Sequence, residues 1–152
     1  RGFRGMTDHS WPVQQAVYAA LRTDAALIAL IGDGASPERA RIYDNVPQGT
    51  WDDDDQSFAA YVTIGDDTAA EAGSKTFEAQ DLTLSLHSWS RYNGRKEIKQ
   101  IMAAVYDVLH DQSLSVSGGT MVNLRWEFSD SFLDADGQTR HGVQRFRMYV
   151  TG

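Results

Sequence analysis

The chain has 152 residues, with 14 basic against 21 acidic side chains, a formal net charge of −7 and no cysteine. This length suits one domain, and a hydrophobic content of 41% is typical of a packed globule rather than a disordered chain. The absence of cysteine excludes a disulfide framework, a thiolate metal site and a cysteine nucleophile. The acidic balance argues against a protein that reads nucleic-acid sequence, because such binding depends on neutralising phosphates.

The first residues have the character of an added segment. Residues 1–5 read Arg-Gly-Phe-Arg-Gly and precede Met6, so we expect them to be an expression-tag remnant and residues 6–152 to form a single domain. No charged, apolar and small-residue pattern of a secretory signal follows Met6, which predicts that the protein stays in the cytoplasm where it is made.

Two short helices are predicted near the N-terminus. Ser10 is expected to cap the first, whose apolar residues recur at steps of three and four up to Leu21. Asp24 is expected to cap the second, which ends at Gly32. Both are rich in small residues, so we expect them to cover one face of a sheet.

The next segments predict strands and one acidic loop. Ile42, Tyr43 and Val46 indicate a short edge strand, ended by Pro47, which cannot donate to a ladder. Four consecutive aspartates, Asp52 to Asp55, repel one another and indicate a solvated loop. Strand composition then returns from Phe58 to Ile64, before Gly65.

The second half predicts a strand, a helix and a hairpin. Alternation favours a half-buried strand from Lys75 to Trp89, and a broad apolar stripe favours a helix from Arg95 to Asp111. A strand from Met121 to Phe132, a turn at Asp134 to Gly137 and a return strand from Thr139 to Val150 complete the pattern. The predicted apolar faces consist of Leu82, Leu84 and Leu86; of Val122, Leu124, Trp126 and Phe128; and of Phe146, Met148 and Val150.

This order of elements predicts an α+β fold: a mostly antiparallel sheet flanked by helices, with a long C-terminal β-hairpin. A twelve-residue strand extends roughly 40 Å, whereas a compact domain of this size has a radius of gyration of about 15 Å. Part of the hairpin is therefore expected to overhang the domain. A half-apolar ribbon of this kind is protected when it pairs with a neighbouring copy, so the pattern itself suggests oligomerisation.

No catalytic, cofactor-binding or metal-ligating set emerges from the residues. The four histidines lack metal-ligand spacing, no Gly-x-Ser-x-Gly turn is present, and the Asp134 to Gly137 turn lacks the glutamate of a calcium loop. A small hydrolase using His87 or His141 stays open as an alternative from another class. It predicts a concave pocket in which one of these histidines touches a serine or a carboxylate.

Arginine and tyrosine side chains supply the candidate contact residues instead. Arg145 and Arg147 share a face with Tyr149, opposite the apolar face of the last strand. Arg91 and Arg95 lie at the corner before the long helix. A row of guanidinium groups that meets an acidic loop on another copy would favour self-association and fix its register.

Four segments together carry a family resemblance. They are Tyr43 to Gln48, Trp89 to Glu97, Leu109 to Asp111 and Arg140 to Arg147. In this order the chain resembles the small tail-completion, or tail-terminator, proteins of long-tailed phages, above all those of prophages and gene transfer agents, and is similar to the tail terminator of phage lambda.

The resemblance implies a structural virion protein without cofactor, not an enzyme. Such proteins form a ring, a hexamer in the particle, on the head-proximal end of the tail. The ring stops polymerisation of the tail tube protein and presents the docking surface for the head-tail connector protein. DNA passes through the lumen without sequence recognition. The protein would be found in the bacterial cytoplasm during assembly and then in the tail of the particle. Within the structural class, the alternative is a head-completion or adaptor protein of the head-tail joint.

Overall fold

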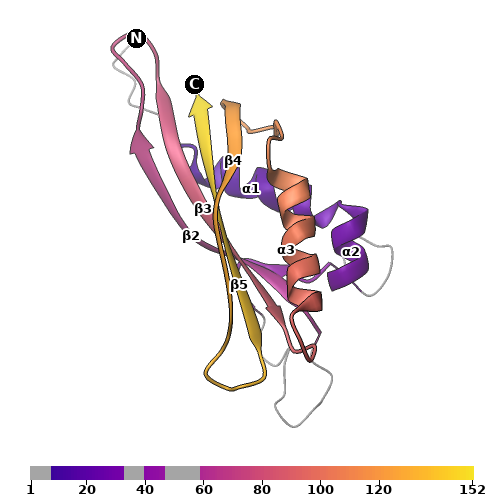
Figure 1. The fold of residues 1–152 in the computed structure, drawn as a ribbon. Helices are drawn as coiled ribbons and strands as arrows, with labels where there is room; N and C mark the ends of the chain where they lie inside the picture. The colour runs from indigo at the N-terminus through magenta and orange to yellow at the C-terminus, as the bar shows by residue number, and fades with distance from the viewer. Residues whose placement is uncertain (1–7, 33–39, 47–58) are drawn as a thin grey trace.

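The fold is a five-stranded sheet with three helices on one face, as the computed structural model shows for residues 8–32, 40–46 and 59–152 (Figure 1). The helices are α1 (Ser10–Arg22), α2 (Ala25–Ile31) and α3 (Lys96–Leu109). The strands are β1 (Ile42–Tyr43), β2 (Tyr61–Glu71), β3 (Ala79–Ser90), β4 (Thr120–Leu133) and β5 (Arg140–Thr151).

The predicted fold class is confirmed. The strand order is β1-β2-β3-β5-β4, and every pair is antiparallel except β1 with β2. The long C-terminal hairpin is formed by β4 and β5. Its position makes β4 an edge strand of the described sheet, whereas β5 lies between β3 and β4.

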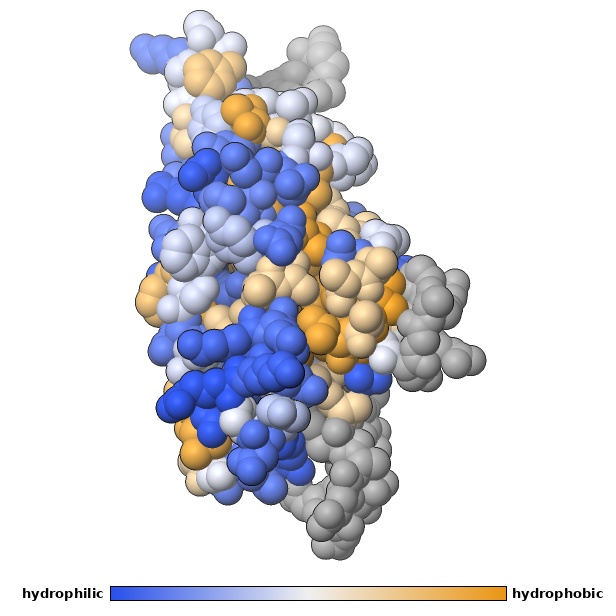
Figure 2. All heavy atoms as spheres, turned by 45° about the vertical axis from the view of Figure 1, so that its right-hand side comes forward, coloured by the Kyte–Doolittle hydropathy of each residue, from blue (hydrophilic) through white to orange (hydrophobic). Residues whose placement is uncertain are grey.

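The core lies between the helices and one face of the sheet. Its apolar side chains come from alternate positions of the strands and from one stripe of each helix. The largest fully buried side chains are Phe146, Leu21, Leu27, Ile31, Leu82, Leu86, Ile98, Ile101, Leu109, Leu124, Met148 and His9. Figure 2 shows further apolar side chains gathered over the short helix α2, while hydrophilic groups cover much of the surface toward the sheet.

The start of α1 differs from the prediction. Ser10 is the first helical residue and not its cap, because His9 occupies the cap position and makes no side-chain cap hydrogen bond. The Asp8 carboxylate instead accepts a hydrogen bond from the Ser10 backbone N–H at 2.9 Å. The second cap is as predicted, since the Asp24 carboxylate accepts from the Leu27 N–H and α2 ends at Gly32.

The strand β2 is longer than predicted. It does not end at Gly65 but continues to Glu71 through an irregularity in its register between Ile64 and Asp67. Conversely, β3 begins at Ala79 and not at Lys75, since the Ser74 N–H donates to the Phe77 carbonyl in a turn. The two strands form a long hairpin. Its first strand is longer than predicted because Gly65 lies at an irregularity within the strand and does not end it.

The apolar face of β4 also differs from the prediction. Met121 and Leu124 face the core, whereas Val122, Trp126 and Phe128 of the predicted apolar face are exposed. Two register shifts in the β4–β5 pairing, between Met121 and Asn123 and between Trp126 and Phe128, change which side of the sheet each residue faces. A strict period of two therefore fails along this strand.

Several expectations lie outside the described residues. These are the tag-like residues 1–5, the run Asp52 to Asp55 and the strand start at Phe58. Val46 is described but is not part of β1. No helix in the described part of the chain is long and apolar enough to span a membrane.

Candidate interaction surface

The face of the sheet opposite the helices carries the polar and aromatic side chains; we call it the open face. No described helix lies on this side (Figure 1). One end of the open face holds a network of charged side chains, and the end near the β4–β5 turn holds a row of aromatic rings. Each is assembled from strands that are distant in the sequence.

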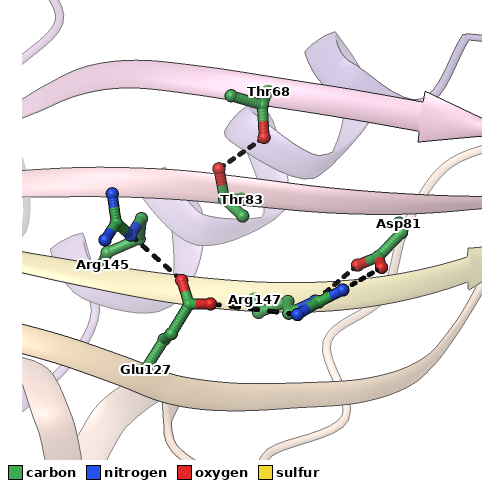
Figure 3. Close-up of polar contacts among 6 residues, drawn as sticks. All are labelled: Thr68, Asp81, Thr83, Glu127, Arg145 and Arg147. Carbon is green, nitrogen blue, oxygen red and sulfur yellow. Dashed lines mark hydrogen bonds and ion pairs between the residues drawn. The ribbon is translucent and has the colours of Figure 1, made fainter.

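Four ionic side chains form the charged network: Asp81, Glu127, Arg145 and Arg147 (Figure 3). The Arg147 Nε donates to an Asp81 carboxylate oxygen at 2.9 Å, and the Arg145 Nε donates to Glu127 at 3.0 Å. Glu127 also lies 3.9 Å from the second guanidinium. The network therefore ties β3, β5 and β4 together across the open face.

The network neutralises charges that the sequence left unpaired. Arg145 and Arg147 do share the face predicted for them, with side chains 45% and 58% exposed. Their partners are carboxylates of the same chain, and the hydrogen bond from Arg147 holds the pKa of Asp81 below its ordinary value. Exposed ion pairs contribute only about 0–1 kcal/mol each, so the network defines the surface more than it stabilises the fold.

The remaining predicted residues occupy different places. Tyr149 lies on β5, opposite Asp81 on β3, and so belongs to the charged end of the open face. The Arg91 Nε donates to the Thr139 hydroxyl at 3.0 Å and thereby joins the end of β3 to the β4–β5 turn. Arg95 is exposed at the N-terminal end of α3. The structure thus brings Arg145, Arg147 and Tyr149 together and separates them from Arg91 and Arg95.

The β4–β5 turn is explained by its own hydrogen bonds. The Asp136 carboxylate accepts from the Thr139 hydroxyl and from the backbone N–H groups of Thr139 and Gln138. These bonds lower the pKa of Asp136 to about 2. Gly137 has a φ of 75°, a conformation that glycine adopts without strain. Among the described residues, no group of three or more potential ligands is arranged to hold a metal ion.

The aromatic row crosses four strands at the same level. Tyr61, Trp89, His141 and Phe132 are successive register partners on β2, β3, β5 and β4. Their ring centroids are 5.9, 3.8 and 4.9 Å apart in that order, and Tyr43 on β1 lies 6.0 Å from Tyr61. Sequence reasoning missed this row, because each ring is unremarkable until the register places it beside the next.

A histidine pair adjoins the aromatic row. His87 Nδ1 and His141 Nε2 are 2.7 Å apart, so one ring must be neutral to accept from the other. Burial lowers the pKa of His87, partly opposed by Asp66. Burial and the neighbouring His87 also lower the pKa of His141, which lies 3.6 Å from Asp134.

This geometry gives the hydrolase alternative no support. His141 does touch a carboxylate, but the hydrogen-bond partner of His87 is another histidine and not a serine. The hollows along α3 and α1 are lined by other residues. His141 is instead part of the aromatic row, and the His87 ring packs beside it, 4.9 Å from His141 and 6.3 Å from Trp89.

The outer half of β4 is the least covered part of the hairpin. Its residues Phe128 to Leu133, which we call the distal edge, are all exposed, with Phe128, Phe132 and Leu133 at 43–46%. In the described sheet this strand pairs only with β5. The inner half differs, since the Leu124 carbonyl accepts from the Asp111 N–H and the Trp126 N–H donates to His110.

A groove runs between α3 and the distal edge. It consists of two hollows of about 190 and 250 Å³ that share Ser131. The lining residues are Arg95 at the N-cap of α3, Ile98, Lys99 and Met102 of the helix, Ser129 to Leu133 of the distal edge, and Arg140 of β5. We call this the α3–β4 groove. Three cationic side chains against the single carboxylate of Asp130 give it a positive balance.

The described surface thus combines an open sheet face, which carries ion pairs and stacked rings, with the exposed distal edge of β4. Residues 15–151 match the family model of the tail completion protein gp17. The chain belongs to this family, which consists of structural tail completion proteins and is not a known enzyme class.

Two individual proteins illustrate the relationship. The tail completion protein gp17 of Bacillus phage SPP1 is 28% identical over 90 residues, which is 59% of this chain and 66% of that relative, so the match spans just under two thirds of its length. A chain of the virion of a native gene transfer agent particle superposes with a TM-score of 0.80 at 28% identity, covering 95% of this chain and 98% of that chain. The predicted family resemblance is thereby confirmed.

Proposed function

We propose that this protein is the tail terminator of a phage or gene transfer agent. It would form a homo-oligomeric ring, a hexamer in the particle, on the head-proximal end of the tail. There it would stop polymerisation of the tail tube protein and provide the docking surface for the head-tail connector protein. Membership in the tail completion family and the likeness to a gene transfer agent virion chain support a place in the tail.

The observation that carries the proposal is the exposed distal edge of β4. In the described sheet, its large apolar side chains are exposed and its outer side has no strand partner, features that a soluble monomer ordinarily protects. A ring of identical copies would cover such edges without a second protein. For contacts between subunits or with the tube we propose Arg145, Arg147 and Tyr149 of the open face, together with Arg91 and Arg95 at the corner before α3.

The net charge of −7 is compatible with DNA crossing the lumen. A surface that held phosphates strongly would slow passage, whereas an acidic chain gives little nonspecific affinity. We propose that DNA passes without sequence recognition. Assembly would take place in the bacterial cytoplasm before the protein is incorporated into the tail.

The decisive experiment removes the gene and measures tail length in the resulting lysates. Loss of a terminator gives overlong tails, because nothing halts the tube protein. Loss of a head-completion or adaptor protein would instead leave full heads beside free tails of normal length. That second result would overturn the terminator proposal and place the protein on the head side of the joint.

A surface test addresses the arginines. Arg145→Glu with Arg147→Glu is expected to weaken self-association or tube capping while the monomer stays folded, as light scattering and circular dichroism would report. The matched control, Asp81→Ala with Glu127→Ala, removes the network but keeps both arginines. Unchanged assembly in the arginine variant would remove these two residues from the interface.

A further inference from the structure

The sheet has a second exposed edge besides β4. The strand β1 pairs with β2 only at Val62 and Thr63, so the continuation of β2 has no partner on its outer side in the described sheet. Residues 66–71 of this continuation are all exposed. We call them the acidic edge, because Asp66, Asp67 and Glu71 are three of its six residues.

The two edges are complementary in charge. The α3–β4 groove presents Arg95, Lys99 and Arg140 beside the distal edge. The acidic edge presents three carboxylates and, between them, the small residues Ala69 and Ala70, which allow close approach of a second strand. Opposite charges that meet in this way set the register and exclude pairing of like edges.

The strand directions are also compatible. The chain alternates direction from β2 through β3 and β5 to β4, so β2 and β4 run in opposite directions at the two sides of one sheet. Copies related by rotation about an axis along the strands keep these directions. The β4 of one copy would then meet the β2 of the next as an antiparallel pair.

The levels of the two edges require a stagger between copies. Across the sheet, the register places Thr68 of the acidic edge opposite Arg125 in the inner half of β4. Phe132 of the distal edge lies opposite Tyr61, near the start of β2. Pairing the distal edge with the acidic edge therefore shifts each copy by about five residues, or roughly 17 Å along the strand direction. Across the four strand spacings from one β2 to the next this inclines the strands by about 41°, within the range of sheets that close around an axis.

From these observations we infer that the distal edge of β4 receives the acidic edge of β2 from a second copy of this chain, which lies as an added strand beside the α3–β4 groove. The contact joins two different surfaces, so it continues from copy to copy, and it gives a ring when the rotation between neighbouring copies closes. An isologous pairing of β4 with β4 would give only a closed dimer. This inference rests on the proposed ring and names its joint.

The absence of cysteine provides a direct test. Ser131→Cys on the distal edge and Ala69→Cys on the acidic edge are made as separate proteins, mixed with the tail tube protein and treated with a short bis-maleimide cross-linker. The mixture of the two variants is expected to give a cross-linked dimer, and neither variant alone should do so. Ala103→Cys on the exposed side of α3 is the matched control and should not cross-link.

The outcomes separate the joint from the proposed function. Cross-linking of Ser131→Cys with itself would establish an isologous contact and overturn the inference. Capped tubes without any cross-link would overturn it as well, while the terminator proposal would stand. Failure to cap the tube at all, with normal-length tails after gene deletion, would overturn both the inferred joint and the terminator proposal.

Charge reversal tests the complementarity independently. Asp67→Lys with Glu71→Lys, or Arg95→Glu with Lys99→Glu, is expected to weaken self-association about tenfold at low salt. The quadruple variant restores opposite charges at every joint and should regain association to within about threefold of the unmodified chain. A quadruple variant weaker than either double variant would contradict the pairing of these edges.

Discussion

The two faces of the sheet are built from alternate residues of the same strands, yet their environments are opposite. On β5, Phe146 and Met148 are 1% exposed under the helices, whereas the side chains of Arg145 and Arg147, which alternate with them, are 45% and 58% exposed. Burial of apolar area stabilises the covered face, whereas exposed ion pairs and stacked rings occupy the open face. Stability and contact chemistry are therefore carried by different residues of one strand.

The largest effect is expected from a matched pair of phenylalanines. Phe146→Ala removes a buried ring and should lower the free energy of unfolding by about 3–5 kcal/mol. Phe128→Ala, at a side chain 45% exposed on the open face, should cost under about 1 kcal/mol. Denaturant titration of both variants measures the difference. Equal losses would mean that the open face is covered in the isolated protein.

A smaller effect is expected where the open face is tightly packed. A Cβ added at Gly65 would lie 2.5 Å from the His87 ring, so Gly65→Ala must displace that ring. We expect a loss of about 1–3 kcal/mol, measured by thermal or denaturant unfolding. Gly137→Ala has open space around its Cβ but a positive φ, and separates crowding from backbone strain. Full stability of Gly65→Ala would show that His87 can move freely.

The charged network should contribute less to the free energy of unfolding than the packing around Gly65. Asp81→Asn leaves Arg147 with Glu127 alone and is expected to lower the denaturant midpoint slightly at low salt, and less at high salt because exposed pairs are screened. Denaturant midpoints in low and high sodium chloride measure both values. A cost that does not change with salt would indicate that the network acts through packing instead of charge.

The smallest effect concerns the histidine pair and pH. Burial lowers the pKa values of His87 and His141 in the folded state, so below about pH 6.5 the unfolded chain binds more protons than the folded one. The pair's contribution to stability is complete above this pH and is lost as the pH falls. Unfolding at pH 7.5 and 5.5 should show a larger loss for the unmodified chain than for His87→Gln with His141→Gln. An equal loss would contradict the assignment.

Local patterns predicted much of the fold. The apolar stripe of α3 and the alternation of β3 are properties of neighbouring residues, and both elements are present. The helix lies within two residues of its predicted bounds, whereas β3 begins four residues later than predicted. The turn at Asp134 to Gly137 follows from its own side chains. The predictions were wrong where a residue type occurs in two structural contexts. Gly65 was predicted to end a strand but lies within it, and Ser10 was predicted to cap a helix but is its first residue.

The candidate surface was predicted only in part. The face shared by Arg145, Arg147 and Tyr149 follows from a period of two. The pairing of these arginines with Asp81 and Glu127 does not follow from that period. The two carboxylates lie on other strands, and a register shift in β4 decides the position of Glu127. The row of rings has the same origin, since Trp89 and His141 are stacked only through the pairing of β3 with β5.

The sequence by itself determined the fold class, the hairpin and the arginine face, because these depend on periodicity and turn chemistry within short segments. The tertiary structure alone decided which side of the sheet the outer residues of β4 face, which charges are paired and which edges remain exposed. The physical reason is that register is a long-range property. A shift of one residue moves every following side chain to the other face and changes every cross-strand neighbour.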